Sequence, residues 1–358
     1  MQKKIVIILF LMNKDTIQQK AIEAHIASNC KSIIGLSVGM GKTKIAIDRI
    51  FSLRKINSQA KILFTGAREV YSINFQSELS KWKCSNKNID MICNKSLHNY
   101  IKHYDLIIYD EAHKEADRVY LELIKLIKIN PNVEILGLTG TPLKDHPIYS
   151  ILPISFTYLM HNAIEEKLLN NFEMYILKYD LPNDERALYN YYYKRYTNAP
   201  MSKTYCPELN KLKIFLNKLN SKVEIVNSII NKNFTDKKVL IYAGSIEQSN
   251  QFDYPKFNST LNKELKKSIY DKFYHSENDK LVNVGILKES VSIPNLKCGF
   301  VLGIDSSSSS KQQLIGRFLR LTVNDLSKIY FIVAKNTVEE KWVLNGMDNF
   351  KQIKIINL

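Results

Sequence analysis

The sequence has few of the features that mark secreted, zinc-binding or membrane proteins. Its five cysteines are scattered, and no two of them form a C-x-x-C pair. This pattern argues against a zinc module or a disulfide framework and predicts a reducing compartment. No apolar run reaches the length of a membrane span, so we expect no membrane partner. The expected location is cytoplasmic, or the host-cell cytoplasm for a viral or phage protein.

A complete signal peptide is also missing. The apolar stretch from Ile5 to Met12 follows two lysines, but it is short and no small-residue cleavage site comes after it. We therefore expect translation to begin at Met12.

Acidic residues are scarce relative to basic ones. The chain has 35 Asp and Glu against 51 Lys and Arg, which gives a net charge of +16. Such a balance favours a polyanionic partner, with nucleic acid as the first candidate, although lysine-rich solvation of an ordinary surface explains it as well. With 358 residues, 45% of them hydrophobic, the chain is long enough for two domains with separate cores.

The strongest local pattern is a strand, a glycine-containing loop and a helix at residues 33–47. Backbone N–H groups and the helix dipole at such a junction attract phosphate. In the P-loop (Walker A) pattern, Lys42 binds the β- and γ-phosphates of a nucleotide and the Thr43 hydroxyl binds Mg²⁺. Leu36 stands where the pattern usually has its first glycine.

A second pattern is an apolar strand at residues 104–109 that ends in two carboxylates. Ligand-binding residues of parallel sheets gather at the carboxyl ends of strands. There Asp110 would hold Mg²⁺ and Glu111 would orient and deprotonate water. A helix N-cap also explains an Asp-Glu pair, but it does not explain the phosphate loop upstream. Further strands at 62–65, 89–93 and 133–138 predict a doubly wound parallel sheet.

The second half of the chain predicts another α/β domain. Its expected strands are 172–177, 239–243, 281–284, 300–303 and 329–333. The expected domains are 13–160 and 165–358, the latter with a helical segment at about 182–232.

Two basic stretches in this half have more than one explanation. Residues 189–196 interleave tyrosines with Lys194 and Arg195, which suits base stacking or amphipathic helix packing, and we leave them outside the expected site. Arg317 and Arg320 share a helix face, where they are either solvated or bound to a surface carboxylate, as is usual, or act as arginine fingers on a nucleotide.

Four motifs occur together and in order: Gly-Met-Gly-Lys-Thr, Asp-Glu-Ala-His (a DEAH box), Thr-Gly-Thr-Pro and Gln-x-x-Gly-Arg-x-x-Arg. This set resembles a superfamily 2 helicase of the DEAD/DEAH type over about residues 17–333. Residues 91–97 and 287–294 are most similar to compact DNA helicases and translocases of the restriction-enzyme and phage branch-migration type. The resemblance implies an α/β fold of two RecA-like doubly wound parallel-sheet domains in tandem, with an ATP cleft between them.

The resemblance also assigns roles to individual residues. ATP would be bound by Gln18, which is similar to an adenine-reading glutamine, and by Gly39, Met40, Gly41, Lys42 and Thr43. Mg²⁺ would be held by Thr43 and Asp110, and the catalytic residues would be Lys42, Glu111, Arg317 and Arg320. The resemblance implies that His113, Thr139, Thr141 and Gln313 couple the state of the bound ATP to contact between the domains. Nucleic acid would be contacted by Arg68, Ser96, Gly244 and Ser245. From the residues alone, an exposed helical glutamine is the commoner explanation for Gln18.

The implied function is an ATP-dependent DNA helicase or translocase with ATP and Mg²⁺ as cofactors. An RNA helicase is the alternative, since the DEAH box is shared with RNA helicases. A catalytically inactive scaffold would have lost Lys42, Asp110, Glu111 or the arginines, and all are present. An accessory replication, recombination or repair protein is a further partner to consider, because no wedge domain is visible.

Overall fold

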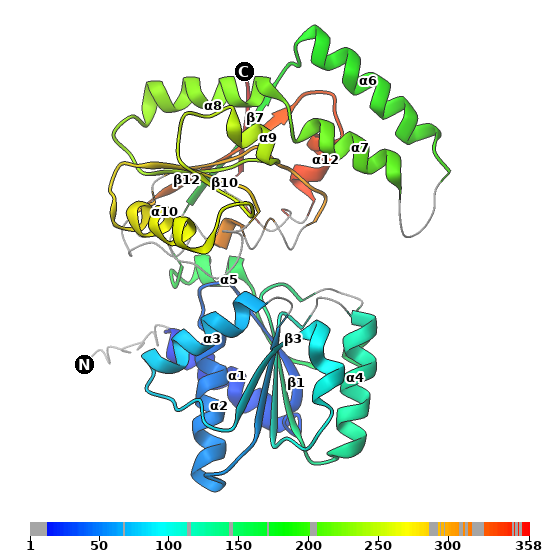
Figure 1. Cartoon of the computed structure of the whole chain (residues 1–358), viewed down its shortest axis with the longest axis vertical. Helices are drawn as coiled ribbons and strands as arrows, with labels where there is room; N and C mark the ends of the chain where they lie inside the picture. The colour runs from blue at the N-terminus through cyan, green and yellow to red at the C-terminus, as the bar shows by residue number, and fades with distance from the viewer. Residues whose placement is uncertain are drawn as a thin grey trace, which may run out of the picture. The chain divides into compact units, whose positions relative to one another are not determined.

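The chain forms two compact units that divide between Leu168 and Leu169. A computed structural model describes residues 13–66, 69–112, 116–142, 146–169, 172–200, 206–285, 293, 295–296, 298–307, 311, 314–316, 326–345, 347, 350 and 353–358. Each unit has its own parallel sheet with helices packed against it (Figure 1).

The first unit contains a six-stranded sheet in the order β3-β2-β4-β5-β1-β6. Its strands are β1 Lys31–Leu36, β2 Ile62–Gly66, β3 Ile89–Cys93, β4 Leu106–Asp110, β5 Glu134–Thr139 and β6 Ile154–Tyr158. All of these strands pair in parallel. The central strands are buried along most of their length, as expected for a parallel sheet covered on both faces.

Helices cover both faces of this sheet. The chain's helices here are α1 Lys14–Ala27, α2 Lys42–Ile56, α3 Glu69–Lys81, η1 Asn94–Tyr100, α4 Ala116–Ile129, η2 Pro147–Ser150 and α5 Met160–Glu165. Figure 1 shows α1, α2 and α3 on one side of the sheet and α4 on the other. Under α4, Leu123 and Leu126 join a buried cluster with Ile107 and Ile135 of the sheet. This burial of apolar side chains holds the helix to the strands.

The second unit contains a seven-stranded parallel sheet in the order β13-β7-β12-β11-β8-β10-β9. Its strands are β7 Phe172–Tyr179, β8 Val239–Tyr242, β9 Lys256–Phe257, β10 Lys280–Asn283, β11 Cys298–Val301, β12 Ser327–Ala334 and β13 Ile353–Asn357. Strand β7 lies between β12 and β13, so its two neighbours come from the far end of the chain.

The helices of the second unit are α6 Asn183–Asn198, α7 Pro207–Leu216, α8 Asn220–Asn233, α9 Ile246–Asn250, α10 Lys263–His275 and α12 Glu339–Leu344. Figure 1 shows α8 and α10 on opposite sides of the sheet. On the α8 side, Val223 and Val226 pack with Leu212 of α7 against Val239 and Ile241. This cluster forms a core between these helices and the sheet.

The predicted fold class is confirmed, because both halves of the chain are parallel-sheet α/β domains. Every strand expected from the sequence is present. Strands β6, β9 and β13 were not predicted, and the expected helical segment at about 182–232 consists of α6, α7 and α8. Residues 1–12, which include the expected start at Met12, lie outside the described residues.

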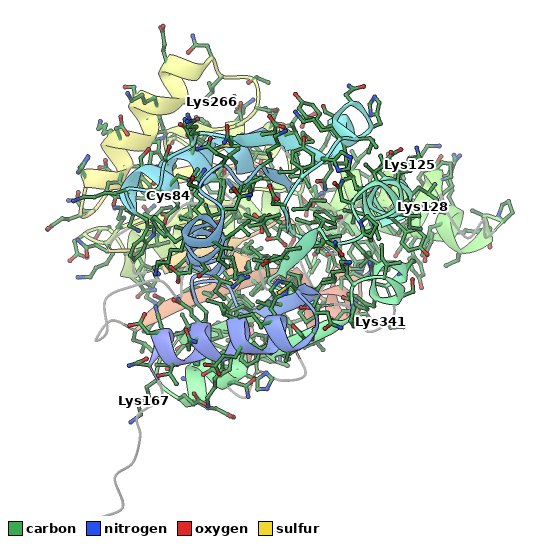
Figure 2. All side chains as sticks on the ribbon, turned by 90° about the horizontal axis from the view of Figure 1, so that it is seen from below. Cys84, Lys125, Lys128, Lys167, Lys266 and Lys341 are labelled. Carbon is green, nitrogen blue, oxygen red and sulfur yellow. The ribbon has the colours of Figure 1, made fainter. Side chains whose placement is uncertain are left out.

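Exposed lysines are found in both units. Figure 2 shows Lys125 and Lys128 next to each other on α4, and Lys341 on α12, all exposed. Such side chains account for part of the positive charge as ordinary solvated surface. No helix among the described residues is both long enough and apolar enough to cross a bilayer.

Candidate functional site

Three neighbouring strands of the first unit end in the motifs that the sequence marks as functional. Strand β5 lies between β4 and β1, with Thr139 opposite Gly35 and Leu138 opposite Asp110. The phosphate loop, the acidic pair and the threonines therefore leave the same edge of the sheet side by side. This carboxyl edge is where doubly wound folds bind their ligands.

The loop after β1 turns sharply at two glycines. Gly39 has a φ of 89° and Gly41 a φ of 86°, a region that residues with a side chain seldom adopt. Gly41 is also crowded, since a Cβ there would lie 2.3 Å from Nε2 of Gln18. Helix α2 begins directly after it, so Lys42 and Thr43 occupy the first turn, where the positive end of the helix dipole favours an anion.

Gln18 ties helix α1 to this loop. Its side chain is only 8% exposed, and Nε2 donates a 2.9 Å hydrogen bond to the main-chain oxygen of Met40. The glutamine is thus not a solvated helical residue, which was one of the two explanations left open by the sequence. Its reading of adenine stays a prediction.

Lys42 lies over the loop and beside the chain that leaves β5. Its Nζ donates to the main-chain oxygen of Leu36 at 3.3 Å. A Cβ on Gly140 would come within 3.0 Å of the same Nζ and 3.4 Å of Val38 Cγ2. The absence of a side chain at Gly140 therefore leaves room for the ammonium group. Sequence spacing does not single out Gly140, because the crowding arises only when β1 and β5 are neighbours.

The acidic pair is held in a fixed and unusual backbone conformation. Glu111 has a φ of 52°, and its N–H donates to Oδ1 of Asp110 at 3.0 Å. The next residue, Ala112, donates its N–H to Leu138 at 2.9 Å. A left-handed non-glycine residue costs on the order of 1–3 kcal/mol, and Glu111 is one of eight such residues in the described part of the chain. The Glu111 side chain is largely buried, whereas Asp110 is partly exposed.

The threonines lie next to this pair. Thr139 and Thr141 are both buried, and the Thr141 N–H donates to Oγ1 of Thr139 at 3.2 Å. On the other side, the N–H of Ser37 donates to the main-chain oxygen of Tyr158 at 2.9 Å. Strand β6, which the sequence did not predict, thereby supports the phosphate loop.

The donor set suits a hard divalent cation. Thr43 and Asp110 are both partly exposed; Thr43 offers a hydroxyl from the first turn of α2, which follows β1, and Asp110 offers a carboxylate from the end of β4, on the other side of β5. Mg²⁺ prefers such oxygen ligands together with water and phosphate oxygens. These residues therefore fit the cation that the sequence predicts.

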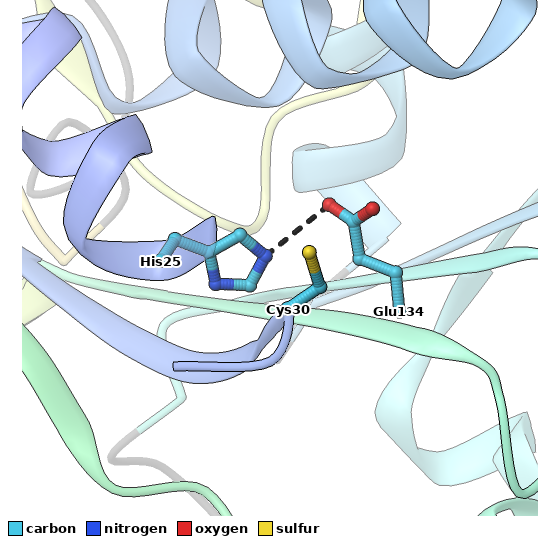
Figure 3. A group of neighbouring side chains, drawn as sticks. All are labelled: His25, Cys30 and Glu134. Atoms are coloured by element: carbon cyan, nitrogen blue, oxygen red, sulfur yellow. Dashed lines mark hydrogen bonds and ion pairs between the residues drawn. The ribbon is translucent and has the colours of Figure 1, made fainter. Parts of the chain in front are cut away.

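A second group of metal-ligating side chains lies elsewhere, at the start of β1 and β5. His25, Cys30 and Glu134 have ligand atoms within 4.8 Å of one another (Figure 3). Glu134 is already engaged, because Nε and Nη2 of Arg49 each donate to it at 2.8 Å. His25 contacts Glu134 through Nε2 at 3.2 Å and Ser32 through Nδ1 at 2.8 Å.

The pKa values in this group also fit a hydrogen-bonded network. Burial raises the pKa of Glu134, but hydrogen bonds from Arg49 and His25 outweigh it and leave that pKa below its usual value. Burial, and then the charge of Glu134, raises the pKa of the Cys30 thiol. An ionised carboxylate paired with a guanidinium and a protonated thiol suit a structural network better than a metal centre.

Two predicted nucleic-acid contacts in the second unit have clear local roles. The Ser245 hydroxyl caps α9 by accepting the N–H of Gln248 at 3.0 Å. Gly244 is tightly packed, since a Cβ there would lie 2.5 Å from Oδ1 of Asn217. These roles explain why a serine and a glycine stand there, and contact with nucleic acid stays a prediction, as it does for Ser96 in η1.

The remaining predicted site residues cannot be placed beside these. Arg68, His113, Gln313, Arg317 and Arg320 lie outside the described residues.

Comparison with known proteins gives a family match in the second unit. Residues 210–322 match the helicase conserved C-terminal domain. No curated protein matches the chain by sequence.

Solved structures share the fold of the chain. A fragment assigned to the HsdR subunit of a type I restriction enzyme from Vibrio vulnificus is similar with a TM-score of 0.66 and 15% identity, covering 96% of this chain and 68% of that one. The ATP-dependent Type ISP restriction-modification enzyme LlaBIII, solved bound to DNA, has a TM-score of 0.65 and 16% identity. The match covers 96% of this chain and only 31% of LlaBIII. Dbp5 from S. cerevisiae, bound to RNA and ADP BeF3, has a TM-score of 0.60 and 10% identity. The match covers 96% of this chain and 89% of the Dbp5 chain.

Proposed function

We propose that this chain is an ATP-dependent nucleic-acid helicase or translocase of superfamily 2 that acts on DNA. It would couple ATP hydrolysis to strand unwinding or branch migration. The observation that carries the proposal is the meeting of the phosphate loop, the acidic pair and the threonines at three adjacent strand ends. The helicase C-terminal domain match at residues 210–322 supports the same reading of the second unit.

Each of the proposed site residues of the first unit would have a separate role in ATP hydrolysis. The loop N–H groups and Lys42 would bind the phosphates, and Glu111 would orient and deprotonate the attacking water. Thr43 and Asp110 would hold Mg²⁺, which supplies charge neutralisation to the phosphate oxygens when bound. Gln18 would act on the same loop through its bond to Met40.

The second unit would complete the site on ATP binding. Arg317 and Arg320 are proposed as arginine fingers that stabilise the charge of the transferring phosphoryl group. His113, Thr139, Thr141 and Gln313 would couple the state of the nucleotide to contact between the units across an ATP cleft. Closure on ATP and opening after hydrolysis would then move the chain along a strand.

Backbone contacts would supply the affinity for DNA. We assign them to Arg68, Ser96, Gly244 and Ser245, so binding should be largely independent of sequence and sensitive to salt. RNA is the second candidate, because similar folds have been solved with RNA as well as with DNA. The likeness of residues 287–294 to DNA translocases favours DNA.

The ATPase rate with no nucleic acid, single-stranded DNA, branched DNA or RNA tests the proposal. DNA should stimulate hydrolysis more than RNA does, and Lys42→Ala should abolish the stimulated rate. Equal turnover under all four conditions would contradict a motor function, and stronger stimulation by RNA would contradict the DNA preference. Arg317→Ala and Arg320→Ala should keep nucleotide binding and lower turnover by roughly 10³-fold or more.

A further inference from the structure

The stretch of alternating tyrosines and cations at residues 189–196 forms the second half of helix α6. In Figure 1, α6 lies at the outer margin of the second unit with α7 beside it. Tyr189 is buried and stacks with Tyr193, while Tyr192 packs against Phe215 of α7. The tyrosines on this side of the helix therefore serve helix packing, which was one of the two alternatives given by the sequence.

The other side of α6 is exposed and has a different composition. Tyr191, Lys194, Arg195 and Asn198 follow the spacing i, i+3, i+4, i+7 and so share one face of the helix. Together with Ala199 and Pro200, which follow α6, and Glu208 of α7, they line a pocket of about 540 Å³. Tyr191 is 53% exposed although it is a large aromatic residue. All of the residues that line this pocket belong to the second unit.

The ring of Tyr191 is held in place rather than free to rotate. Nη1 of Arg195 donates to the Tyr191 hydroxyl at 2.8 Å, and the guanidinium lies 5.6 Å from the ring centroid. Arg195 is in turn fixed by Glu208, to which Nε donates at 3.0 Å. A ring fixed before binding loses little conformational freedom when a flat partner stacks on it.

The charges around the ring favour a polyanion. Lys194 and Arg195 of α6 and Lys211 of α7 are exposed cations, and Arg195 and Lys211 both pair with Glu208. Three positive charges against one negative leave an excess of two beside the ring. An ordered exposed ring with cations beside it is the arrangement that binds unpaired bases and their phosphates. A protein partner gains nothing specific from this combination unless it is acidic.

We propose that the α6–α7 pocket is a binding site for single-stranded nucleic acid, in which a base stacks on Tyr191 while Lys194 and Arg195 contact the backbone. The site lies outside the predicted motor motifs, and the identity of the polymer rests on the proposed function. It would hold a strand independently of the ATP state.

Binding of fluorescent oligo(dT) and oligo(U) to the full chain without nucleotide tests the site. Tyr191→Ala should weaken binding about fivefold or more, the lower end of base–aromatic stacking, and Tyr191→Phe should keep most of the affinity because it keeps the ring. Tyr274→Ala is the matched control, since Tyr274 is an exposed tyrosine (36%) on α10. The two oligonucleotides show whether the site distinguishes DNA from RNA.

The salt dependence of oligonucleotide affinity distinguishes a lost phosphate contact from a loss of folding. Each phosphate contact on a single strand contributes about 0.7 to the slope of log affinity against log salt concentration. Lys194→Ala should therefore flatten the slope by about that amount, and Lys232→Ala, an exposed lysine on α8, should not.

Unchanged affinity and slope in Tyr191→Ala and Lys194→Ala would overturn the inference, and if nucleic acid still stimulated ATPase activity the proposed function would stand. Absence of oligonucleotide binding and of stimulation in the unmodified protein would overturn both. A pocket that instead binds an acidic peptide and no oligonucleotide would also overturn it.

Discussion

The amide nitrogen of Gln18 lies 2.9 Å from the main-chain oxygen of Met40 and donates a hydrogen bond to it. This bond joins the first helix of the chain to the centre of the phosphate loop. It also places the amide where a side chain on Gly41 would have to stand. The conformation of the loop therefore depends on a residue far upstream in the sequence.

Removing the Gln18 amide should loosen the loop. Gln18→Ala loses one buried hydrogen bond, which contributes about 0.5–1.5 kcal/mol, so the affinity for ATP should fall roughly three- to tenfold. Nucleotide binding by calorimetry measures this, with Gln19→Ala as a neighbouring exposed control. If Gln18 also reads adenine, the loss will be larger for ATP than for GTP, and equal losses would leave only the loop contact.

Gly140→Ala should impair hydrolysis with little effect on stability. The new methyl group would lie 3.0 Å from Nζ of Lys42, the flexible end of a side chain, which can move away. A displaced ammonium should lower kcat/KM roughly ten- to a hundredfold. Steady-state kinetics and thermal unfolding of the same variant separate the two effects.

Gly137→Ala is the matched control for that change, three residues earlier on the chain. There the methyl group would lie 2.5 Å from Cγ1 of Ile33 in the packed sheet. It should destabilise the fold by about 1–3 kcal/mol. Equal losses of stability in both variants would mean that Gly140 serves packing and not the lysine.

Glu111→Gln should separate ATP binding from hydrolysis. Glutamine keeps the size of the side chain but cannot take a proton from water, so ATP should bind while turnover is lost. Because closure and grip on DNA are coupled in the proposed cycle, this variant should bind DNA more tightly with ATP than without it. DNA affinity at one salt concentration, beside the ATPase rate, checks both points.

Asp110→Ala is the comparison for that experiment. The proposed loss of a Mg²⁺ ligand should weaken binding of Mg–ATP together with hydrolysis. Retained hydrolysis in Glu111→Gln would remove the residue from the mechanism. Lost hydrolysis without any effect of ATP on DNA affinity would keep the base and contradict the coupling.

The Arg49–Glu134 pair should make stability depend on acid pH. The pKa of Glu134 lies below its usual value because hydrogen bonds from Arg49 and His25 outweigh the effect of burial. A lowered carboxyl pKa adds stability above the unfolded-state value of about 4.3, and this stability is lost as the pH falls through the folded-state pKa. Glu134→Gln should cost about 1.5–3 kcal/mol at pH 7, since it leaves a partly buried guanidinium without its counter-ion.

Denaturant unfolding at several pH values measures this difference. The gap between the unmodified protein and Glu134→Gln should be constant near neutral pH and should narrow below about pH 4. Glu122→Gln is the control, because the partner of Glu122 is Lys125, which is 58% exposed. Its cost should stay under about 1 kcal/mol. A gap for Glu134→Gln that does not change with pH would contradict the ion pair.

Strands in the centre of each sheet were predictable from local sequence. Ile107 and Ile108 point to opposite faces of the sheet and are both buried, because helices cover a parallel sheet on both sides. Such a continuous apolar run can be recognised in the sequence without knowing which strands pair with it. Edge strands lack that signal. Ile355 and Ile356 of β13 are largely exposed, and the strand exists because it pairs with β7, a contact that no local pattern reveals.

The candidate site shows the same division. Lys42, Thr43, Asp110 and Glu111 were singled out as candidates because their residue types carry the chemistry and their spacing is regular, and their roles stay predictions. Gly140 was missed because its importance is the space it leaves for Lys42, which depends on the neighbouring strand. The left-handed backbone of Glu111 could not be foreseen either, since the sequence gives no sign of it.

The position of β7 between β12 and β13 has a consequence for synthesis of the protein. Strand β7 leaves the ribosome early in its unit, but both strands that bond to it are made much later. The first unit needs no such delay, because β1 to β6 all precede β7 in the chain. Contacts between distant segments form slowly, and unpaired strand edges promote aggregation. The nascent chain should therefore hold a folded first unit beside an open β7 edge, which is the stage at which a chaperone would matter most.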